Sequence, residues 1–451
     1  MLEKLKLLSG KIDFFTVGLF FIPFDNLFFA PSAGWATITP FFFCAYVLQN
    51  IKLLKKIIEK EKKFIIALAM FMVYQIVLIF MNGVHIRALI DTAGTLALGL
   101  SFFFSLVIRY EVRNDNLMND DGKKLLVAYI FSFVYGIIRL LAMNFSENLL
   151  EIFTFLEKRS YERLAFSFTE PSYIGIHIIG VLFLFSYLVS DRKLARKMFV
   201  LGVSFFVLQM IFSGSTRALI DIGVFLLLFI VRWSVKNPKR IVLNVSILLV
   251  IGVVIFIIAF SSVRVRSITS QGVYADPSLA SRFFRINAIT QGFFDEPIRM
   301  LFGYGMGNMI IPFKSGYDAA VSTYASSYWE EVLVLGEAQE IDTLFCLYVK
   351  LISDCGLILT VLFFAYIIKK FINKKLDFTV LLMCLWLYAQ FDSYAFYTTW
   401  LILFLCKYYD KEKYGDTYMG FFIEEKLERA ENFFIIQIKN LSRKITKKAT
   451  K

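Results

Sequence analysis

Long apolar runs alternate with short polar connections over most of this chain. Each run holds about 20 apolar residues, enough for an α-helix to cross the roughly 30 Å hydrocarbon core of a bilayer. Within lipid such a run must be helical, because a helix satisfies its own backbone hydrogen bonds. The pattern predicts about twelve spans, at residues 13–31, 35–54, 64–82, 86–108, 124–143, 171–190, 197–213, 216–233, 241–260, 342–368, 377–394 and 398–408.

Composition supports the same fold class. Hydrophobic residues make up 58% of the chain and charged residues only 19%, whereas soluble domains average about a quarter charged residues. The five cysteines all lie within apolar segments, which favours buried thiols over a disulfide framework or a metal site. We therefore expect an all-α polytopic membrane protein that uses no cofactor.

The net charge of +13 is concentrated in particular connections. Lysine and arginine gather in the connections 52–63, 192–197, 232–240 and 369–375, which alternating spans place on one side of the membrane. The opposite connections, around 31–34, 82–85, 213–215 and 395–398, contain no lysine or arginine. By the positive-inside rule both termini are cytoplasmic. This distribution argues against nucleic acid as a partner and for a lipid bilayer. Abundant Phe, Ile and Lys indicate an AT-rich bacterial genome, so we expect the bacterial cell membrane.

The spacing of the spans divides the chain into four parts. Residues 1–260 form a membrane domain with nine spans and an outer loop at 144–170. Residues 261–341 form an extracytoplasmic loop subdomain, because a structureless connection of that length is unusual. The sequence Asp276-Pro277-Ser278 predicts a helix start within it. Residues 342–408 return to the membrane, and the cytoplasmic tail 409–451 has the periodicity of an interfacial helix.

Candidate chemistry lies on the predicted outer side, where ionisable residues are close to the spans. A guanidinium group binds phosphate oxygens in a bidentate manner and keeps its charge, so we expect an anionic lipid-linked ligand such as a polyprenyl pyrophosphate. The candidate ligand-binding arginines are Arg139, Arg163, Arg217, Arg282 and Arg285.

Two carboxylates, Glu170 and Asp342, are candidates for a general base, with His177 and Tyr304 as supporting residues. Each has a structural alternative. Glu170 and Asp342 precede predicted helices and could cap them, and His177 could be a hydrogen-bonded core residue. Tyr304 lies in a glycine-rich turn. Arg217 could pair with Asp221 one helical turn away.

The same residues resemble a known family. Arg163–Ser172, which reads RLAFSFTEPS, looks like the "R…F.EPS" element of Wzy-type polysaccharide polymerases, which join O-antigen or capsular repeat units. Ser213–Arg217, which reads SGSTR, is similar to an "SxSR" element of the O-antigen ligase and polymerase superfamily. Arg282 followed by Pro297 and Gly303–Asn308 resembles the large periplasmic loop of that superfamily, and Asp342–Phe345 before Gly356 resembles the element that returns to the membrane.

The resemblance implies a metal-independent, inverting glycosyltransferase of the GT-C type. Its donor would be a glycan on undecaprenyl pyrophosphate, and its acceptor a second lipid-linked repeat unit. A chain-length regulator and a flippase would be its partners. The superfamily's ligases carry a histidine where the chain re-enters the membrane, and this chain has Asp342 there, which favours a polymerase over a ligase. The alternative from another class of protein is a flippase for lipid-linked sugars. A flippase would need charged residues in a cavity through the membrane centre, whereas most charges here lie at helix ends.

Overall fold

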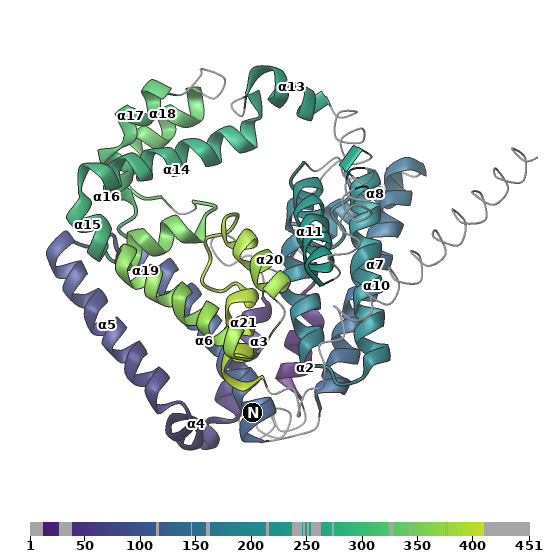
Figure 1. The fold of residues 1–451 in the computed structure, drawn as a ribbon. Coiled ribbons are helices and arrows are strands. Elements are labelled where there is room, and N and C mark those ends of the chain that lie inside the picture. Colours follow the sequence, from purple (N-terminus) through teal and green to yellow (C-terminus); the bar gives the residue numbers. More distant parts are fainter. Residues whose placement is uncertain are drawn as a thin grey trace, which may run out of the picture.

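The computed structural model describes residues 12–26, 38–113, 117–145, 147–158, 163–212, 216–236, 246, 249, 252–253, 263–272, 275–323, 329–341, 344–374, 376 and 378–409. Within these ranges the chain is helical and contains no β-strand, as predicted. Figure 1 shows helices α14, α17 and α18 across the top of the molecule and α4 (Leu54–Lys60) at the bottom. We call these the loop end and the basic end.

Six helical segments in the described residues are long and apolar enough to cross a membrane, as expected of a polytopic membrane protein. They are α5 (Lys62–Asn82), α6 with its continuation η2 (Ile86–Val112), α7 (Met118–Phe145), the segment Pro171–Leu188, α10 (Arg192–Phe212) and α19 (Leu347–Asn373). Other helices also fall in predicted spans: α2 (Phe14–Phe21), α3 (Thr39–Gln49), α11 (Thr216–Lys236), α20 (Phe378–Tyr388) and α21 (Tyr397–Tyr408).

Not every predicted boundary holds. The predicted span 377–394 is wrong at its end, because α20 stops at Tyr388 and residues 389–396 form a non-helical connection to α21. In the predicted span 13–31, α2 ends at Phe21 and a turn follows. Most of the predicted span 241–260 and almost all of the tail lie outside the described residues.

Helix α5 shows why these helices belong in lipid. Only 11% of its apolar window is buried, and large side chains such as Met70, Val73 and Phe80 are exposed. An apolar surface of this extent would be unstable against water but matches hydrocarbon. The two buried residues of α5, Gln75 and Leu78, face the protein instead.

The segment Pro171–Leu188 is the centre of the bundle, with 89% of its window buried. It passes from a 3₁₀ turn through α9 (Ile174–His177) into η4, a π-helical turn at Ile178–Phe183. Such π-turns are rare and often mark functional sites. Two glycines let neighbours approach closely: Gly180 accepts a hydrogen bond from Thr398 through its carbonyl, and Gly175 leaves room for Asp221 of α11.

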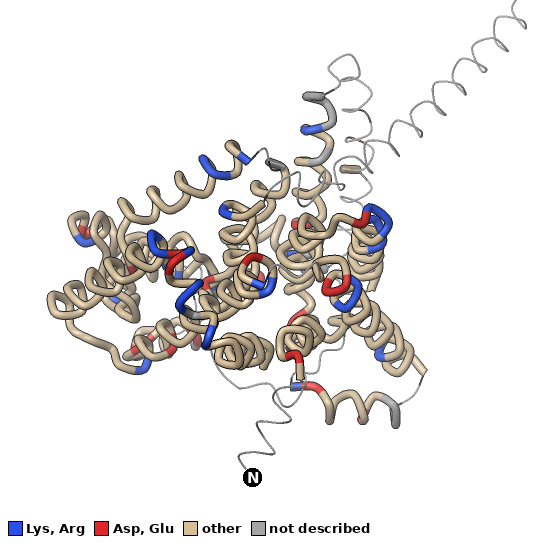
Figure 2. The backbone as a smooth tube through the Cα atoms, turned by 90° about the horizontal axis from the view of Figure 1, so that it is seen from below, with Lys and Arg blue, Asp and Glu red and all other residues tan. Residues whose placement is uncertain are grey.

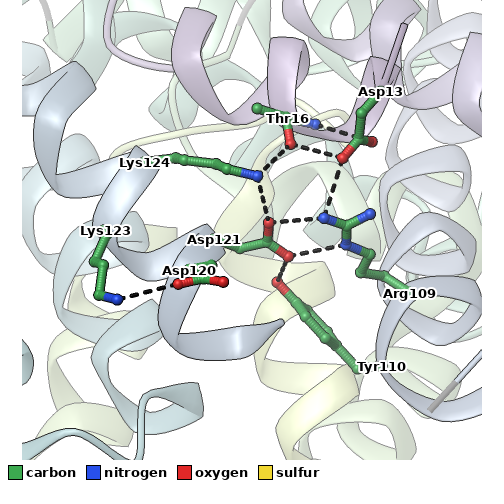
Figure 3. Close-up of polar contacts among 8 residues, drawn as sticks. All are labelled: Asp13, Thr16, Arg109, Tyr110, Asp120, Asp121, Lys123 and Lys124. Carbon is green, nitrogen blue, oxygen red and sulfur yellow. Dashed lines mark hydrogen bonds and ion pairs between the residues drawn. The ribbon is translucent and has the colours of Figure 1, made fainter. Parts of the chain in front are cut away.

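A buried ion cluster ties the helices together at the basic end (Figure 3). Arg109 donates two hydrogen bonds of 2.9 Å to Asp121 of α7 and lies 3.1 Å from Asp13, which precedes α2. Tyr110 adds a third hydrogen bond to Asp121 at 3.1 Å. Removing one partner of such a buried pair typically costs about 3–5 kcal/mol, so the cluster fixes how these three helices meet.

Other polar contacts join the predicted cytoplasmic connections at the basic end. Lys60 pairs with Glu111 at 3.0 Å, Glu61 contacts Lys407, and Asn119 bonds Ser190 at 2.9 Å. Figure 2 views the chain from this end and shows charged residues in short stretches between largely uncharged helices.

The loop between the two membrane parts has a hydrophobic core of its own. Asp276 caps α14 (Pro277–Asp295) by accepting a 2.9 Å hydrogen bond from the Leu279 amide, which confirms the predicted helix start. Phe284 and Ala288 of α14 pack with Phe313 in a cluster distinct from that of the membrane helices. The other helices of the loop are α13 (Val263–Gln271), α15 (Pro297–Phe302), α16 (Ile310–Ser315), α17 (Tyr317–Thr323) and α18 (Trp329–Glu337).

A glycine-rich turn at residues 303–308 fastens this loop to the membrane helices. Gly303, Gly305 and Gly307 all have positive φ angles, between 81° and 95°, a conformation that glycine adopts without steric cost. A Cβ on Gly307 would lie 2.5 Å from the backbone nitrogen of Leu89 in α6. The turn also receives a 3.0 Å hydrogen bond from Asn82 of α5, so α5, α6 and the loop are held as one unit.

Candidate functional site

Arg217 lies at the start of α11, and its side chain contacts Gln390 and Phe391, more than 170 positions later in the sequence. Its Nε donates to Gln390 Oε1, its Nη2 lies 3.3 Å from the Gln390 carbonyl oxygen, and its guanidinium stacks 4.5 Å from the Phe391 ring centre. The third nitrogen, Nη1, is buried with no hydrogen-bond partner among the described residues. Since buried polar atoms are nearly always paired, an unpaired guanidinium nitrogen indicates a place for a ligand oxygen.

The alternative of a direct Arg217–Asp221 ion pair is wrong. Gln390 lies between them: its amide Nε2 donates to Asp221 Oδ1 at 2.7 Å, and Trp386 Nε1 donates to the same oxygen at 2.6 Å. Asp221 Oδ2 is buried and unpaired within the described chain. The site therefore has a free donor on Arg217 and a free acceptor on Asp221.

The connection 389–396 supplies site residues that the sequence analysis placed inside a span. Besides Gln390 and Phe391 it contributes Asp392, which is 9% exposed and accepts a hydrogen bond from the Leu344 amide. That contact fixes the chain where it returns to the membrane after the loop. The polar residues of Ala389–Tyr394, AQFDSY, were the available signal, since such a run does not suit the middle of a lipid-facing helix.

Arg282 and Arg285 share one face of α14, as their spacing predicts, and meet over one aromatic ring. Their guanidinium carbons lie 4.6 Å and 5.7 Å from the ring centre of Phe345. Phe345 has a φ of 62°, a strained conformation that costs about 1–3 kcal/mol and often marks functional sites. Arg285 is also 3.1 Å from Glu331, so part of its charge is balanced within the loop.

Glu170 begins the central segment without capping it. Its carboxylate makes no hydrogen bond to the backbone of the following turn and instead accepts one of 3.0 Å from the Ser172 hydroxyl. A capping role therefore does not account for this residue. The backbone of Glu170 is extended, with φ −141° and ψ 146°, as is usual for the residue before a helix.

Electrostatics join these elements into one site. The charge on Arg217 interacts with those of Asp221, Arg282 and Glu170. Two guanidinium groups from distant parts of the sequence are thus close enough to interact electrostatically, together with the carboxylates of Asp221 and Glu170. Such an arrangement suits an anion held by both arginines, with a carboxylate placed to accept a proton from a second group.

Arg139 and Arg163 belong to a separate cluster. Arg139 is 1% exposed and forms a 2.5 Å ion pair with Glu157, while its Nη1 donates to the Arg163 carbonyl oxygen at 3.1 Å. These contacts hold Glu157, which follows α8 (Glu147–Leu156), and the backbone of Arg163 against α7. A phosphate contact by either arginine stays a prediction.

His177 and Tyr304 occupy buried positions. His177 bonds Asp25 at 3.1 Å and stacks on Phe168 at 4.3 Å. Tyr304 is fully buried in the glycine-rich turn, with its hydroxyl 3.4 Å from the Gly292 carbonyl oxygen. Burial, helped by the nearby Glu296, raises the pKa of Tyr304 and keeps its phenol protonated. Asp342 lies outside the described residues.

An open cavity of about 570 Å³ lies at the start of α6, lined by His85, Arg87, Asp91 and Glu340 among others. None of the predicted site residues that the structure describes lines it. In the described part of the chain, no group of three or more His, Cys, Asp or Glu side chains is arranged to hold a metal ion. The candidate site is therefore defined by the contacts around Arg217.

Comparisons with known proteins add no relative to this picture: no protein-family model matches the chain, and no curated protein matches its sequence.

Proposed function

We propose that this protein is a polysaccharide polymerase that joins lipid-pyrophosphate-linked oligosaccharide repeat units at the extracytoplasmic face of the bacterial cell membrane. The proposal includes twelve spans in a GT-C-like arrangement, with both termini in the cytoplasm. It draws on the motif resemblance and on the ion pairs that Lys60 and Glu61 of the connection 52–63 make at the basic end.

One observation carries the proposal. Arg217 and Arg282 come from helices on either side of the bundle–loop junction, yet their charges interact, and Arg217 Nη1 is buried without a partner. Asp221 and Glu170 balance part of this positive charge, and the unpaired Nη1 leaves one guanidinium donor for an anionic ligand. A pyrophosphate diester is such an anion and has several oxygens for bidentate contacts.

The proposed reaction makes one glycosidic bond and releases one lipid pyrophosphate. The acceptor hydroxyl oxygen attacks the anomeric carbon of the donor glycan from the side opposite the leaving group, which inverts the anomeric centre. The bond from that carbon to the pyrophosphate oxygen breaks, and its electron pair leaves with the pyrophosphate. Arg217 and Arg282 stabilise that developing charge.

The proton of the acceptor hydroxyl needs a base. Glu170 is a candidate for this base, because it interacts electrostatically with Arg217 and is not used as a helix cap. Asp342, where the loop returns to the membrane, is the alternative. Substrates and products are lipid-linked, which suits a site at one end of a membrane bundle. A chain-length regulator and a flippase are the proposed partners.

Reconstitution tests the activity directly. Purified protein in liposomes is supplied with an undecaprenyl-pyrophosphate-linked repeat unit, and the products are separated by size. Extension beyond one repeat, with release of undecaprenyl pyrophosphate in equal amount to the new bonds, supports a polymerase. The repeat units are prepared from cells that make the polymer, and the protein is shown to be folded. If only unextended repeat units are then recovered, the proposal is contradicted.

A further inference from the structure

We infer that Asp25 is a positioning residue for the proposed reaction, because it fixes the segment that carries Glu170. This inference rests on the proposed polymerase function. Asp25 follows the first short helix, α2, and is only 4% exposed. A carboxylate this deeply buried requires specific partners, and its partners all lie around residue 170.

Each Asp25 oxygen has a separate partner. Oδ1 accepts a 2.8 Å hydrogen bond from the Thr169 amide, immediately before Glu170. Oδ2 lies 3.1 Å from His177 Nε2, one helical segment after Glu170. The Asp25 backbone carbonyl oxygen also accepts a hydrogen bond from the Thr169 hydroxyl at 3.2 Å. Asp25 thus holds the chain on both sides of Glu170.

The surrounding contacts make this clamp rigid. The Asn26 amide donates to the Ser167 carbonyl oxygen at 3.1 Å, and the Ser167 hydroxyl contacts both the Pro23 carbonyl and Ser132 of α7. Residues 23–26 therefore run beside residues 167–169. The central segment cannot shift relative to this turn without breaking several buried hydrogen bonds, each of which is costly to leave unmade.

His177 completes the clamp and is itself oriented. The Tyr129 hydroxyl donates to the His177 carbonyl oxygen at 3.1 Å and lies 3.4 Å from its Nδ1, while Phe168 stacks on the ring. With its Nε2 proton directed at Asp25, His177 acts as a fixed hydrogen-bond donor. It supports Asp25 through this hydrogen bond.

The consequence for the reaction is positional. Glu170 interacts with Arg217, so the carboxylate and the proposed pyrophosphate site must keep a defined separation. A displacement of about 1 Å at a reacting group can lower a rate about 100-fold. Loss of the Asp25 contacts moves Glu170 but does not alter the contacts of Arg217 with Gln390 and Phe391. The rate of catalysis therefore falls, while the affinity for the donor is kept.

The test compares Asp25→Ala with Asp25→Asn in the liposome extension assay. The alanine removes both side-chain contacts, and we expect kcat per folded molecule to fall about 10- to 100-fold. KM for the lipid-linked donor and inhibition by inorganic pyrophosphate should stay within about threefold. The asparagine keeps an acceptor for Thr169 and bonds the other His177 tautomer, so it should restore most of kcat. If Asp25→Ala does not fold, Asp25→Glu is used in its place, because it keeps the charge but displaces Thr169.

Asp121→Ala is the matched control, since Asp121 is an equally buried aspartate paired with a cation at the basic end. It should lower the yield of folded protein and leave kcat per folded molecule unchanged. The inference is overturned if Asp25→Ala keeps its kcat, or if its loss appears in KM alone. Absence of extension by the wild type would contradict the proposed function itself, whatever the Asp25 variants do.

Discussion

Replacing Arg217 with lysine separates the charge of this residue from its geometry. Arg217 contacts Gln390 through Nε and Nη2 and leaves Nη1 for a ligand. Lysine keeps the positive charge, but its single ammonium group cannot occupy all three positions. The loss of a preorganised donor to developing negative charge typically costs about 3–4 kcal/mol. We therefore expect kcat for chain extension to fall about 100- to 1000-fold.

The same substitution has a smaller effect on stability. Gln390 Oε1 loses its donor in the lysine variant, which costs about 1–3 kcal/mol. Thermal unfolding in detergent measures this separately from activity. Arg299→Lys is the control, because Arg299 is 43% exposed and pairs with Glu296 within the loop; its rate should match that of wild type. A folded Arg217→Lys enzyme that extends glycans within threefold of the wild-type rate would refute the reasoning.

Three further predictions follow from the same contacts. Arg282→Ala should lower kcat about 100-fold. Arg285→Ala should lower kcat less than tenfold, because Arg285 is already paired with Glu331. Equal losses of kcat in the extension assay would contradict this order. Gly307→Ala should destabilise the protein by about 3 kcal/mol or more, because strain at φ 81° adds to a backbone clash, whereas Gly272→Ala at φ 86° with open space should cost about 1–2 kcal/mol. Burial raises the pKa of Glu61 to about 7, although Lys60 lowers it and Lys407 contacts the carboxyl group. The protonated form of Glu61 therefore favours the folded state, and this contribution to stability is present at pH 4.5 and lost as pH rises through 7. The unfolding temperature of wild type relative to Glu61→Gln should therefore fall over that range, and a flat difference would contradict it.

The fold class could be predicted because it depends on the simplest pattern in the chain. Runs of about 20 apolar residues require helices in lipid whatever their neighbours are, and α5, α7, α10 and α19 lie where they were expected. The start of α14 at Asp276 was equally readable, since a capping aspartate followed by proline acts locally. The end of α20 was missed although the polar run Ala389–Tyr394 marks it, and the contacts that this connection makes with α11 follow only from the folded chain.

The candidate site was predictable in its arginines and not in its partners. Arg217 and Arg282 were singled out from residue type and position, and the structure brings their charges together. Gln390 and Asp25 were missed, since each acts through residues more than 140 positions away. A neutral glutamine and an aspartate after a short helix carry no signal in one sequence. Their roles follow only from the folded geometry.

The polymer made by cells tests the central claim most directly. Cells that lack this protein are complemented with wild type, Arg217→Ala or Arg299→Ala, and their lipid-linked and surface glycans are separated by size. The account predicts that the null and Arg217→Ala cells accumulate a single lipid-linked repeat unit at the outer leaflet, while wild type and Arg299→Ala give a ladder of lengths. Accumulation of long lipid-linked polymer would identify a ligase instead, and repeat units retained on the cytoplasmic leaflet would identify a flippase; either result would contradict the account.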